Sequence, residues 1–233
     1  MGWQTANSKQ NQDGFTIVEL MIATVVFSLV LLVITMGVLH FSNSYYKGVN
    51  SSATQQAAQN AIDTISQSLQ FGSAGSAGTD VAPAGAFCAG SEIFIYTLGK
   101  VYPGGTPTGS NSGLYESSNT NAGTCDPASV TNFTIGNELL GPKMRITNVS
   151  VINTDPSSNL WDVSLTVAYG DADLLCNTKL AAGVKGSCNN SSPRYALGDL
   201  VTGNDVACHT DAGSQFCSVA KLETIAQQRV TGS

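Results

Sequence analysis

Charged residues are scarce in this chain, because Asp, Glu, Lys and Arg make up only 11% of its 233 residues. The chain has 10 basic residues against 16 acidic ones, which gives a net charge of −6. Binding along a nucleic-acid backbone needs many cations, so this composition argues against it and leaves room only for a local DNA-binding patch. The exterior is built instead from Ser, Thr, Asn and 24 Gly, which indicates a β-rich domain with many loops.

Motifs that carry catalysis or hold a cofactor are also missing. The sequence contains no nucleophile elbow, no phosphate-binding glycine loop and no HExxH motif. No CxxC pair occurs, and the spacing of Cys208, His209 and Cys217 fits no common zinc pattern. We therefore predict a protein that is not an enzyme, with no metal site and no cofactor.

The N-terminal segment stands out from this polar background because it is long and apolar. Residues 20–39 carry no formal charge and are mostly Leu, Val, Ile, Met and Phe. About 20 apolar residues are enough to cross a bilayer as a helix. Glu19 lies at the start of this stretch, where a carboxylate in lipid needs a partner. A cut between Gly14 and Phe15 supplies one, because the new amine lies one helical turn from Glu19.

Two simpler interpretations explain this segment less well. An ordinary secretory signal needs a short apolar core and a small-residue cleavage site, but no A-x-A pattern occurs around Ala23. A plain membrane anchor accounts for the apolar length, yet it leaves the glycine and the intramembrane carboxylate as coincidences.

The sequence GFTIVELMIATVVFSLVLLVITMGVL, which begins at Gly14, resembles the N-terminus of type IV prepilins and of the pseudopilins of type II secretion. The resemblance implies that a prepilin peptidase cuts after Gly14 and methylates the amine of Phe15. It also implies that Glu19 guides assembly into a filament, where it neutralises the N-terminal amine of a neighbouring subunit. The resemblance covers only the N-terminal part of the chain.

Two features depart from the usual pattern of that family. Asp13 precedes the cleavage glycine where many leaders carry a basic residue or glutamine, and Lys9 is the only basic side chain of the leader. Major pilins usually have a proline in the middle of the apolar segment, where this chain has Met36 followed by Gly37. The missing proline favours a minor pilin.

An amphipathic segment continues the apolar one. Its apolar residues recur mostly at helical spacing, with Gln, Asn and Ser between them. They are Tyr45, Val49, Ala53, Ala57, Ala61, Ile62, Ile65 and Leu69. We predict one helix from Phe15 to Gln70, whose second half packs against a globular head and which ends at the glycine-rich run that begins with Gly72.

These features predict an α+β, type IV pilin-like fold, in which a long N-terminal transmembrane helix packs on an antiparallel β-sheet head with disulfide-stapled loops. Residues 1–14 are assigned to the leader, 15–41 to the transmembrane or filament-core helix, and 42–71 to its amphipathic half. Residues 72–91 are assigned to a linker rich in Gly, Ser and Ala, and 92–233 to the β-rich head.

Several segments of the head have strand patterns. The clearest covers residues 161–169, where apolar and polar side chains alternate. Residues 93–96 are apolar on both faces, and residues 145–152 form a longer candidate. Residues 133–135 are a short candidate. Residues 218–230 suit a helix or a strand, and we favour a strand because minor pilins and pseudopilins often end in one.

Six cysteines follow the apolar segment, and an even number indicates disulfides in an exported domain. The sequence alone allows fifteen pairings. We favour pairing between nearest neighbours, that is Cys88–Cys125, Cys176–Cys188 and Cys208–Cys217. The alternative for the last pair is a metal site that also uses His209.

The leading functional hypothesis is a minor pilin, a structural subunit of a type IV pilus. The resemblance implies a single-pass protein of the cytoplasmic (inner) membrane, with its head outside the cytoplasm. Prepilin peptidase would process it, and the assembly platform would place it among other pilin subunits in the cell-surface pilus or at its tip. Such pili serve adhesion, twitching motility or DNA uptake.

Two alternatives remain open, a type II secretion pseudopilin and a membrane-anchored adhesin that does not polymerise. The sequence does not identify a ligand of the head, whether DNA or a surface. We expect such a ligand at the long polar loops 104–125 and 174–200, which are rich in Gly, Ser, Asn and Pro.

Overall fold

The structure is a computed structural model of the whole chain. It describes residues 14–72, 84–89, 92–103, 113–118, 136–155, 159–178, 188, 194–196, 201–203, 205–210 and 213–229. The chain divides into two compact units, Met1–Asn43 and Ser44–Ser233, which are described separately below.

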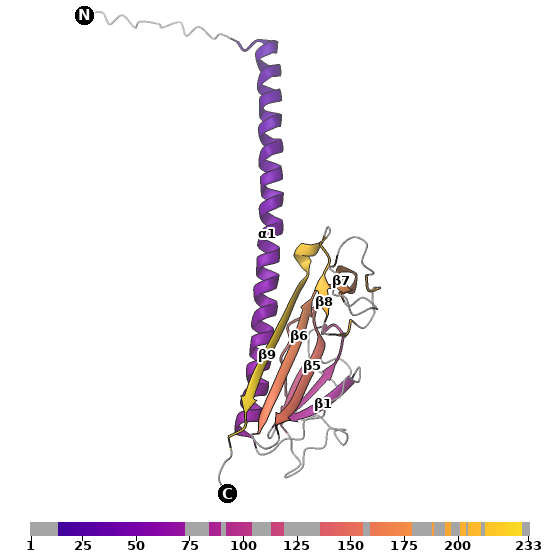
Figure 1. Ribbon diagram of the computed structural model, residues 1–233. Helices are drawn as coiled ribbons and strands as arrows, with labels where there is room; N and C mark the ends of the chain where they lie inside the picture. Colours follow the sequence, from indigo (N-terminus) through magenta and orange to yellow (C-terminus); the bar gives the residue numbers. More distant parts are fainter. Residues whose placement is uncertain are drawn as a thin grey trace, which may run out of the picture. The chain divides into compact units, whose positions relative to one another are not determined.

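Helix α1 (Ile17–Phe71) is 55 residues long and confirms the predicted long N-terminal helix (Figure 1). In the first unit its side chains are exposed from Ile17 to Phe41, including every large apolar one. This part is apolar and long enough to cross a membrane, by length and composition. The exposed apolar surface therefore needs an apolar environment that the described residues of the first unit do not supply.

The second half of α1 buries one face. The buried residues recur at three- and four-residue spacing, which keeps them on one side of the helix. They are Thr54, Ala58, Ala61, Ile62, Ile65, Ser66 and Leu69. Ala58 and Ala61 are fully buried in the core that α1 shares with the sheets. Ala53 remains exposed on another face.

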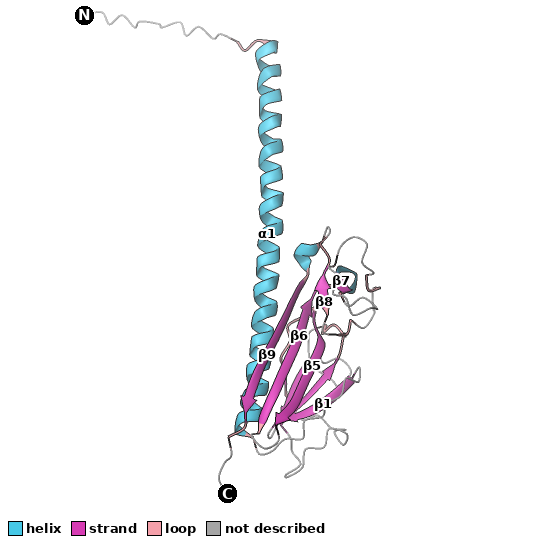
Figure 2. Cartoon of the chain, in the orientation of Figure 1, coloured by secondary structure: helices cyan, strands magenta, loops and turns pink. Residues whose placement is uncertain are grey.

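The described strands form three antiparallel sheets, which Figure 2 shows in magenta. The first sheet has the order β1 (Ala84–Ala89), β2 (Glu92–Thr97), β3 (Leu114–Ser118) and β4 (Asn137–Glu138). The second has the order β5 (Met144–Asp155), β6 (Leu160–Tyr169) and β9 (Ser218–Gln227). The third pairs β7 (Leu175–Asn177) with β8 (Val206–Cys208). Two short 3₁₀ helices accompany them, η2 (Ala172–Leu174) and η3 (Ser214–Phe216).

This arrangement confirms the predicted α+β class, with β2, β5 and β6 where the sequence indicates strands. The ambiguous segment near the C-terminus is strand β9. Its side chains have the two-residue period of a strand, since Lys221 and Glu223 are exposed between less accessible neighbours. One difference concerns residues 72–91, which we predicted to be a linker, because β1 lies inside this range. The mostly small side chains of β1 do not alternate in polarity, so the sequence shows no strand pattern there. The short candidate at 133–135 lies outside the described residues.

One hydrophobic core joins the second half of α1 to both larger sheets. Phe87 of β1 and Phe94 of β2 are paired in register, and their rings stack with centroids 5.1 Å apart. Leu165 and Val167 of β6 are fully buried in the same core. A smaller core lies under β7 and β8, and it contains Ala168, Ala172, Leu175, Val201, Val206 and Cys217.

The residues that follow β9 cap the C-terminal end of α1. The backbone N–H of Arg229 donates to the carbonyl of Gln70 over 3.0 Å, and the side-chain amide of Gln228 donates to the carbonyl of Gly72 over 2.9 Å. The guanidinium of Arg229 lies 5.2 Å from the centre of the Phe71 ring. The last carbonyls of a helix lack partners within it and carry partial negative charge, so a cation and donors here stabilise its end.

We expect Arg229→Ala and Phe71→Ala to be coupled in a double-mutant cycle on the fragment 44–233. The cation–π contact is worth about 0.5–1 kcal/mol at an exposed site, so the double variant should lose less stability than the two single variants together. Urea denaturation gives the four free energies of unfolding. Strict additivity of the two single changes would show that the contact contributes nothing.

Candidate functional site

The predicted processing segment lies immediately before helix α1. Gly14 and Phe15 precede the helix, and the side chain of Phe15 is 81% exposed. We predicted a helix that begins at Phe15, but its first residue is Ile17. The peptide bond between Gly14 and Phe15, where we predict the cut, is therefore outside the helix.

Thr16 and Glu19 explain why the helix starts at Ile17. The backbone N–H of Glu19 donates to the hydroxyl of Thr16 over 3.2 Å, which makes Thr16 the N-cap residue. The order Thr-x-x-Glu is that of a capping box, a signal that our sequence analysis did not use. Glu19 lies in the first turn of α1, where the helix dipole favours a negative charge.

Three hydroxyl side chains within the apolar half of α1 bond to the helix itself. The hydroxyls of Thr24, Ser28 and Thr35 donate to carbonyls of the preceding turn, at 2.9, 2.8 and 2.7 Å. Such hydroxyls do not have to be hydrated, so they are compatible with lipid or with a bundle of helices. Residues 20–43 include no Asp or Glu, so Glu19 is the one carboxylate of this half.

Residues 9–35 match the profile of the prokaryotic N-terminal methylation motif. The chain is a type IV prepilin-like or pseudopilin-like protein. The motif implies processing by prepilin peptidase and pilin assembly at the membrane. Together with the apolar part of α1, the motif also supports membrane anchoring. Searches of the curated proteins and of the solved structures found no match. The motif contains Gly14, Phe15 and Glu19 but does not extend into the head.

The later loops of this prepilin-like protein are held by disulfides. Cys176 is bonded to Cys188 and Cys208 to Cys217, with Cα atoms 6.1 and 5.8 Å apart. These are two of the three pairs in the nearest-neighbour scheme. Cys88 of β1 is buried and disulfide-bonded. Its predicted partner, Cys125, lies outside the described residues, so that pair stays a prediction.

The disulfide between Cys208 and Cys217 also bears on the metal alternative. A zinc site at this place would need the two thiolates as ligands, together with His209. In the structure the two sulfurs are bound to each other, so neither is a free thiolate. The two cysteines therefore act as a structural link between β8 and the start of β9.

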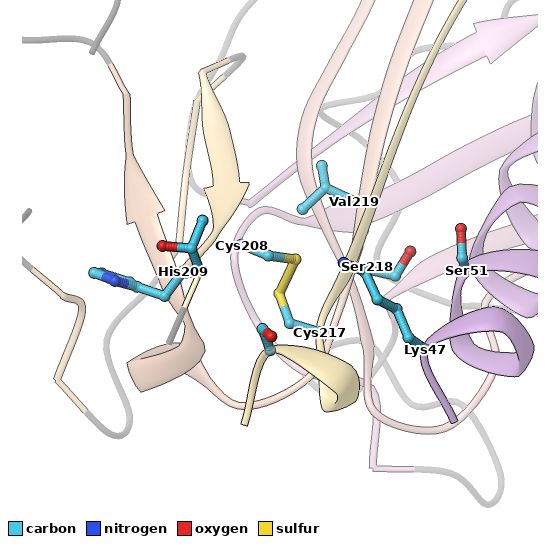
Figure 3. A pocket seen from close by; sticks show the side chains of 9 residues that line it. Lys47, Ser51, Cys208, His209, Cys217, Ser218 and Val219 are labelled. Carbon is cyan, nitrogen blue, oxygen red and sulfur yellow. A yellow bond between two sulfur atoms is a disulfide. The ribbon is translucent and has the colours of Figure 1, made fainter. Parts of the chain in front are cut away.

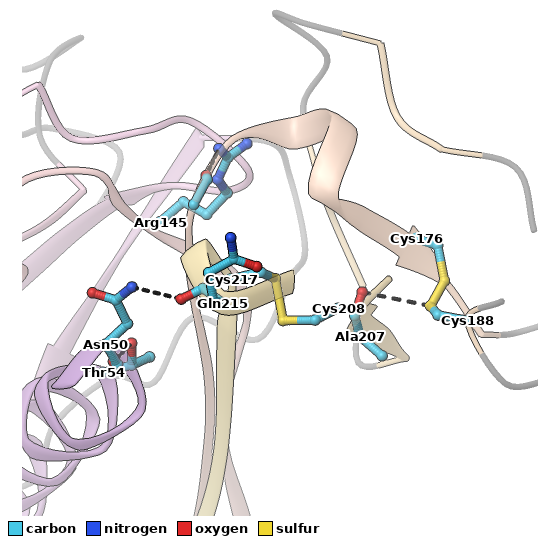
Figure 4. The surroundings of a disulfide bond; sticks show 10 residues. Asn50, Thr54, Arg145, Cys176, Cys188, Ala207, Cys208, Gln215 and Cys217 are labelled. Carbon is cyan, nitrogen blue, oxygen red and sulfur yellow. Dashed lines mark hydrogen bonds between the residues drawn. A yellow bond between two sulfur atoms is a disulfide. The ribbon is translucent and has the colours of Figure 1, made fainter. Parts of the chain in front are cut away.

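Helix η3, which directly precedes Cys217, is attached to α1 within the second unit. The side-chain amide of Asn50 donates to the carbonyl of Gln215 over 2.9 Å, as Figure 4 shows. The rings of Tyr46 and Phe216 lie 5.8 Å apart. The disulfide fixes η3 to β8, and these two contacts fix it to α1. The stapled loops are thus connected to the helix rather than held by the sheet alone.

A buried cation holds the turn that leads from β6 to η2. The guanidinium of Arg145 donates to the carbonyl of Gly170, and burial lowers the pKa of Arg145 while the nearby carboxylate of Asp171 opposes this shift. Gly170 has a φ of 114°, and a Cβ there would lie 2.6 Å from the carbonyl oxygen of Phe216. Only glycine allows β6 to end so close to η3.

We expect Thr16→Ala to loosen the first turn of α1 and Thr16→Ser to preserve it. An N-cap hydroxyl contributes about 1 kcal/mol, so amide hydrogen exchange of Glu19 should become roughly fivefold faster in the alanine variant. The measurement uses the full chain in detergent micelles, followed by NMR. Equal exchange rates in the two variants would show that Thr16 is not the cap.

We expect replacement of Cys208 and Cys217 together by serine to destabilise the head by about 2–4 kcal/mol, because the denatured chain gains the freedom of an open loop. Thermal or urea denaturation of the fragment 44–233 measures the loss. Replacement of Asn50 by alanine, which removes a single hydrogen bond to η3, should cost about 1 kcal/mol and provides a scale. A double serine variant as stable as the parent would contradict a structural role of this disulfide.

Proposed function

We propose that this protein is a minor pilin, a structural subunit that is incorporated into a type IV pilus or placed at its tip. The observation that carries the proposal is the position of Glu19, the one carboxylate at the start of an exposed and otherwise uncharged apolar half-helix. A charge at such a place is costly in lipid and is retained where it has a partner. The N-terminal amine of a neighbouring subunit is that partner.

Processing at the membrane follows from the same segment. Prepilin peptidase cuts after Gly14, outside the helix, and methylates the new amine of Phe15. The subunit remains in the cytoplasmic membrane through residues 15–41, with its head outside the cytoplasm, until the assembly platform inserts it among other pilin subunits. Insertion is favourable because Glu19 then meets an amine, so the protein works by assembly and is not an enzyme.

The uninterrupted helix supports a minor rather than a major pilin. α1 is a single helix through Met36 and Gly37, where major pilins usually carry a proline. The head with its stapled loops is suited to contacts at the pilus, in adhesion, twitching motility or DNA uptake.

A pseudopilin of type II secretion is the second candidate, because the methylation motif is common to both classes of protein. The two differ in where the processed chain is found. Mass spectrometry of filaments sheared from intact cells should find a chain that begins at methylated Phe15. The same chain found only in the membrane fraction would favour the pseudopilin. A chain that still begins at Met1 in every fraction would contradict processing, and it would favour the anchored adhesin.

We expect Glu19→Ala to leave the cut after Gly14 intact but to lower the amount of this protein in sheared filaments by roughly tenfold to a hundredfold. The reason is that an unpaired charge in the membrane is worth about 2.5–3.5 kcal/mol, which insertion no longer relieves. Immunoblots of sheared and membrane fractions measure both effects. Glu223→Ala is the matched control, since this carboxylate lies on the exposed face of β9. Normal incorporation of the Glu19→Ala chain would sink the proposed role.

A further inference from the structure

Lys47 is an isolated charge on α1. No other Asp, Glu, Lys or Arg occurs between Glu19 and Asp63. It follows shortly after the predicted span 15–41 and comes directly after Tyr45 and Tyr46, which are 60% and 47% exposed. Tyrosines and basic residues at the end of a span are typical of the level of the lipid headgroups. The position in the sequence therefore places Lys47 where phosphate groups are concentrated.

A cavity of about 310 Å³ lies beside Lys47, within the second unit. Lys47 and Ser51 line it from α1, where a separation of four residues puts them on one face. The side chain of Lys47 extends toward the start of β9 in Figure 3. The opposite wall comes from the stapled loop and consists of Cys208, His209, Thr210, Ser214, Cys217, Ser218 and Val219.

The chemistry of the lining fits an anion. None of the described residues that line the cavity is acidic. Within the described part of the chain, the side chains of Lys47, Ser51 and Ser218 make no hydrogen bond or ion pair, and the same holds for Ser214. An ammonium and several hydroxyls can all donate to one oxyanion, and hydrogen bonds to a charged group are the strong ones.

The walls of the cavity are fixed, which separates it from the surroundings of an ordinary surface lysine. The disulfide between Cys208 and Cys217 forms part of the wall, and the hydrogen bond from Asn50 to Gln215 holds η3 against α1. Donors that are already in place lose little conformational freedom when a ligand binds.

We propose that this cavity binds a phosphate oxyanion. Lys47 pairs with its charge, and the hydroxyls of Ser51, Ser214 and Ser218 donate to its oxygens. The same chemistry has two sources, the phosphodiester of a phospholipid headgroup and free phosphate. A headgroup in this cavity would tie the base of the head to the bilayer surface before assembly.

The first experiment measures binding of inorganic phosphate by isothermal titration calorimetry. It uses the full chain in a maltoside detergent, at constant ionic strength set with chloride. Lys47→Gln should weaken binding by about tenfold to a hundredfold, and Ser51→Ala by a few-fold to about tenfold. Lys143→Gln is the matched control, because Lys143 is also exposed and does not line the cavity. It should bind phosphate as the parent chain does.

The second experiment distinguishes the two sources. Native mass spectrometry of the full chain, from micelles that contain equal amounts of phosphatidylglycerol and a neutral galactolipid, shows which lipid is retained. Preferential retention of phosphatidylglycerol that Lys47→Gln abolishes identifies the headgroup as the ligand. Binding of inorganic phosphate without lipid retention identifies free phosphate. Either result supports an oxyanion site.

Binding that is equally strong in the parent chain and in Lys47→Gln would overturn the proposal, as would the absence of binding in both experiments. Ser51→Ala keeps the test valid if Lys47→Gln does not fold, because alanine suits a helix and leaves the charge in place. Unchanged binding by Ser51→Ala in that case also overturns it. The outcome does not depend on the role of Glu19, since binding is measured on the isolated chain.

Discussion

The packing of the buried face of α1 against the sheets is the interaction on which the head depends. Ala58 and Ala61 are fully buried in the core that this face of α1 shares with the sheets. Ile62, Ile65 and Leu69 then fill the space between them. A larger residue at either alanine would push the helix outward, because cores are packed too densely to absorb added volume. The contacts of η3 with α1 also depend on this packing, because it sets the position of the helix.

One helix thereby serves two environments. Its first half is apolar on all sides, and its hydroxyls are bonded to its own carbonyls, so it suits lipid or a bundle of similar helices. Its second half is polar on one side and buries the other. The transition lies near Tyr45 and Lys47, where the first aromatic and charged groups suited to an interface occur.

Much of this organisation was predictable because it depends on local patterns. The apolar run and the helical spacing after it predicted α1, and strict alternation predicted β6. The features that were missed depend on contacts between distant residues. β1 is made of small side chains whose strand character comes from pairing with β2, and the cap at the end of α1 comes from Gln228 and Arg229. At the site, Gly14, Phe15 and Glu19 were recognisable from the motif, whereas the start of the helix at Ile17 required the capping role of Thr16. The cavity beside Lys47 was not predictable, since its walls come together only in the fold.

The pairing of β9 has a consequence for the order in which the chain folds. β9 is the last described strand, yet it completes the sheet with β6, and the residues just after it close the end of α1, the first element. Contacts between such distant parts of a sequence form late, because a long loop must first close at a cost in entropy before the contacts can stabilise the chain. The head of a nascent chain is therefore incomplete until β9 has paired with β6. During this interval the edge of β6 that β9 will cover is unpaired, and an unpaired strand edge can pair wrongly with another chain.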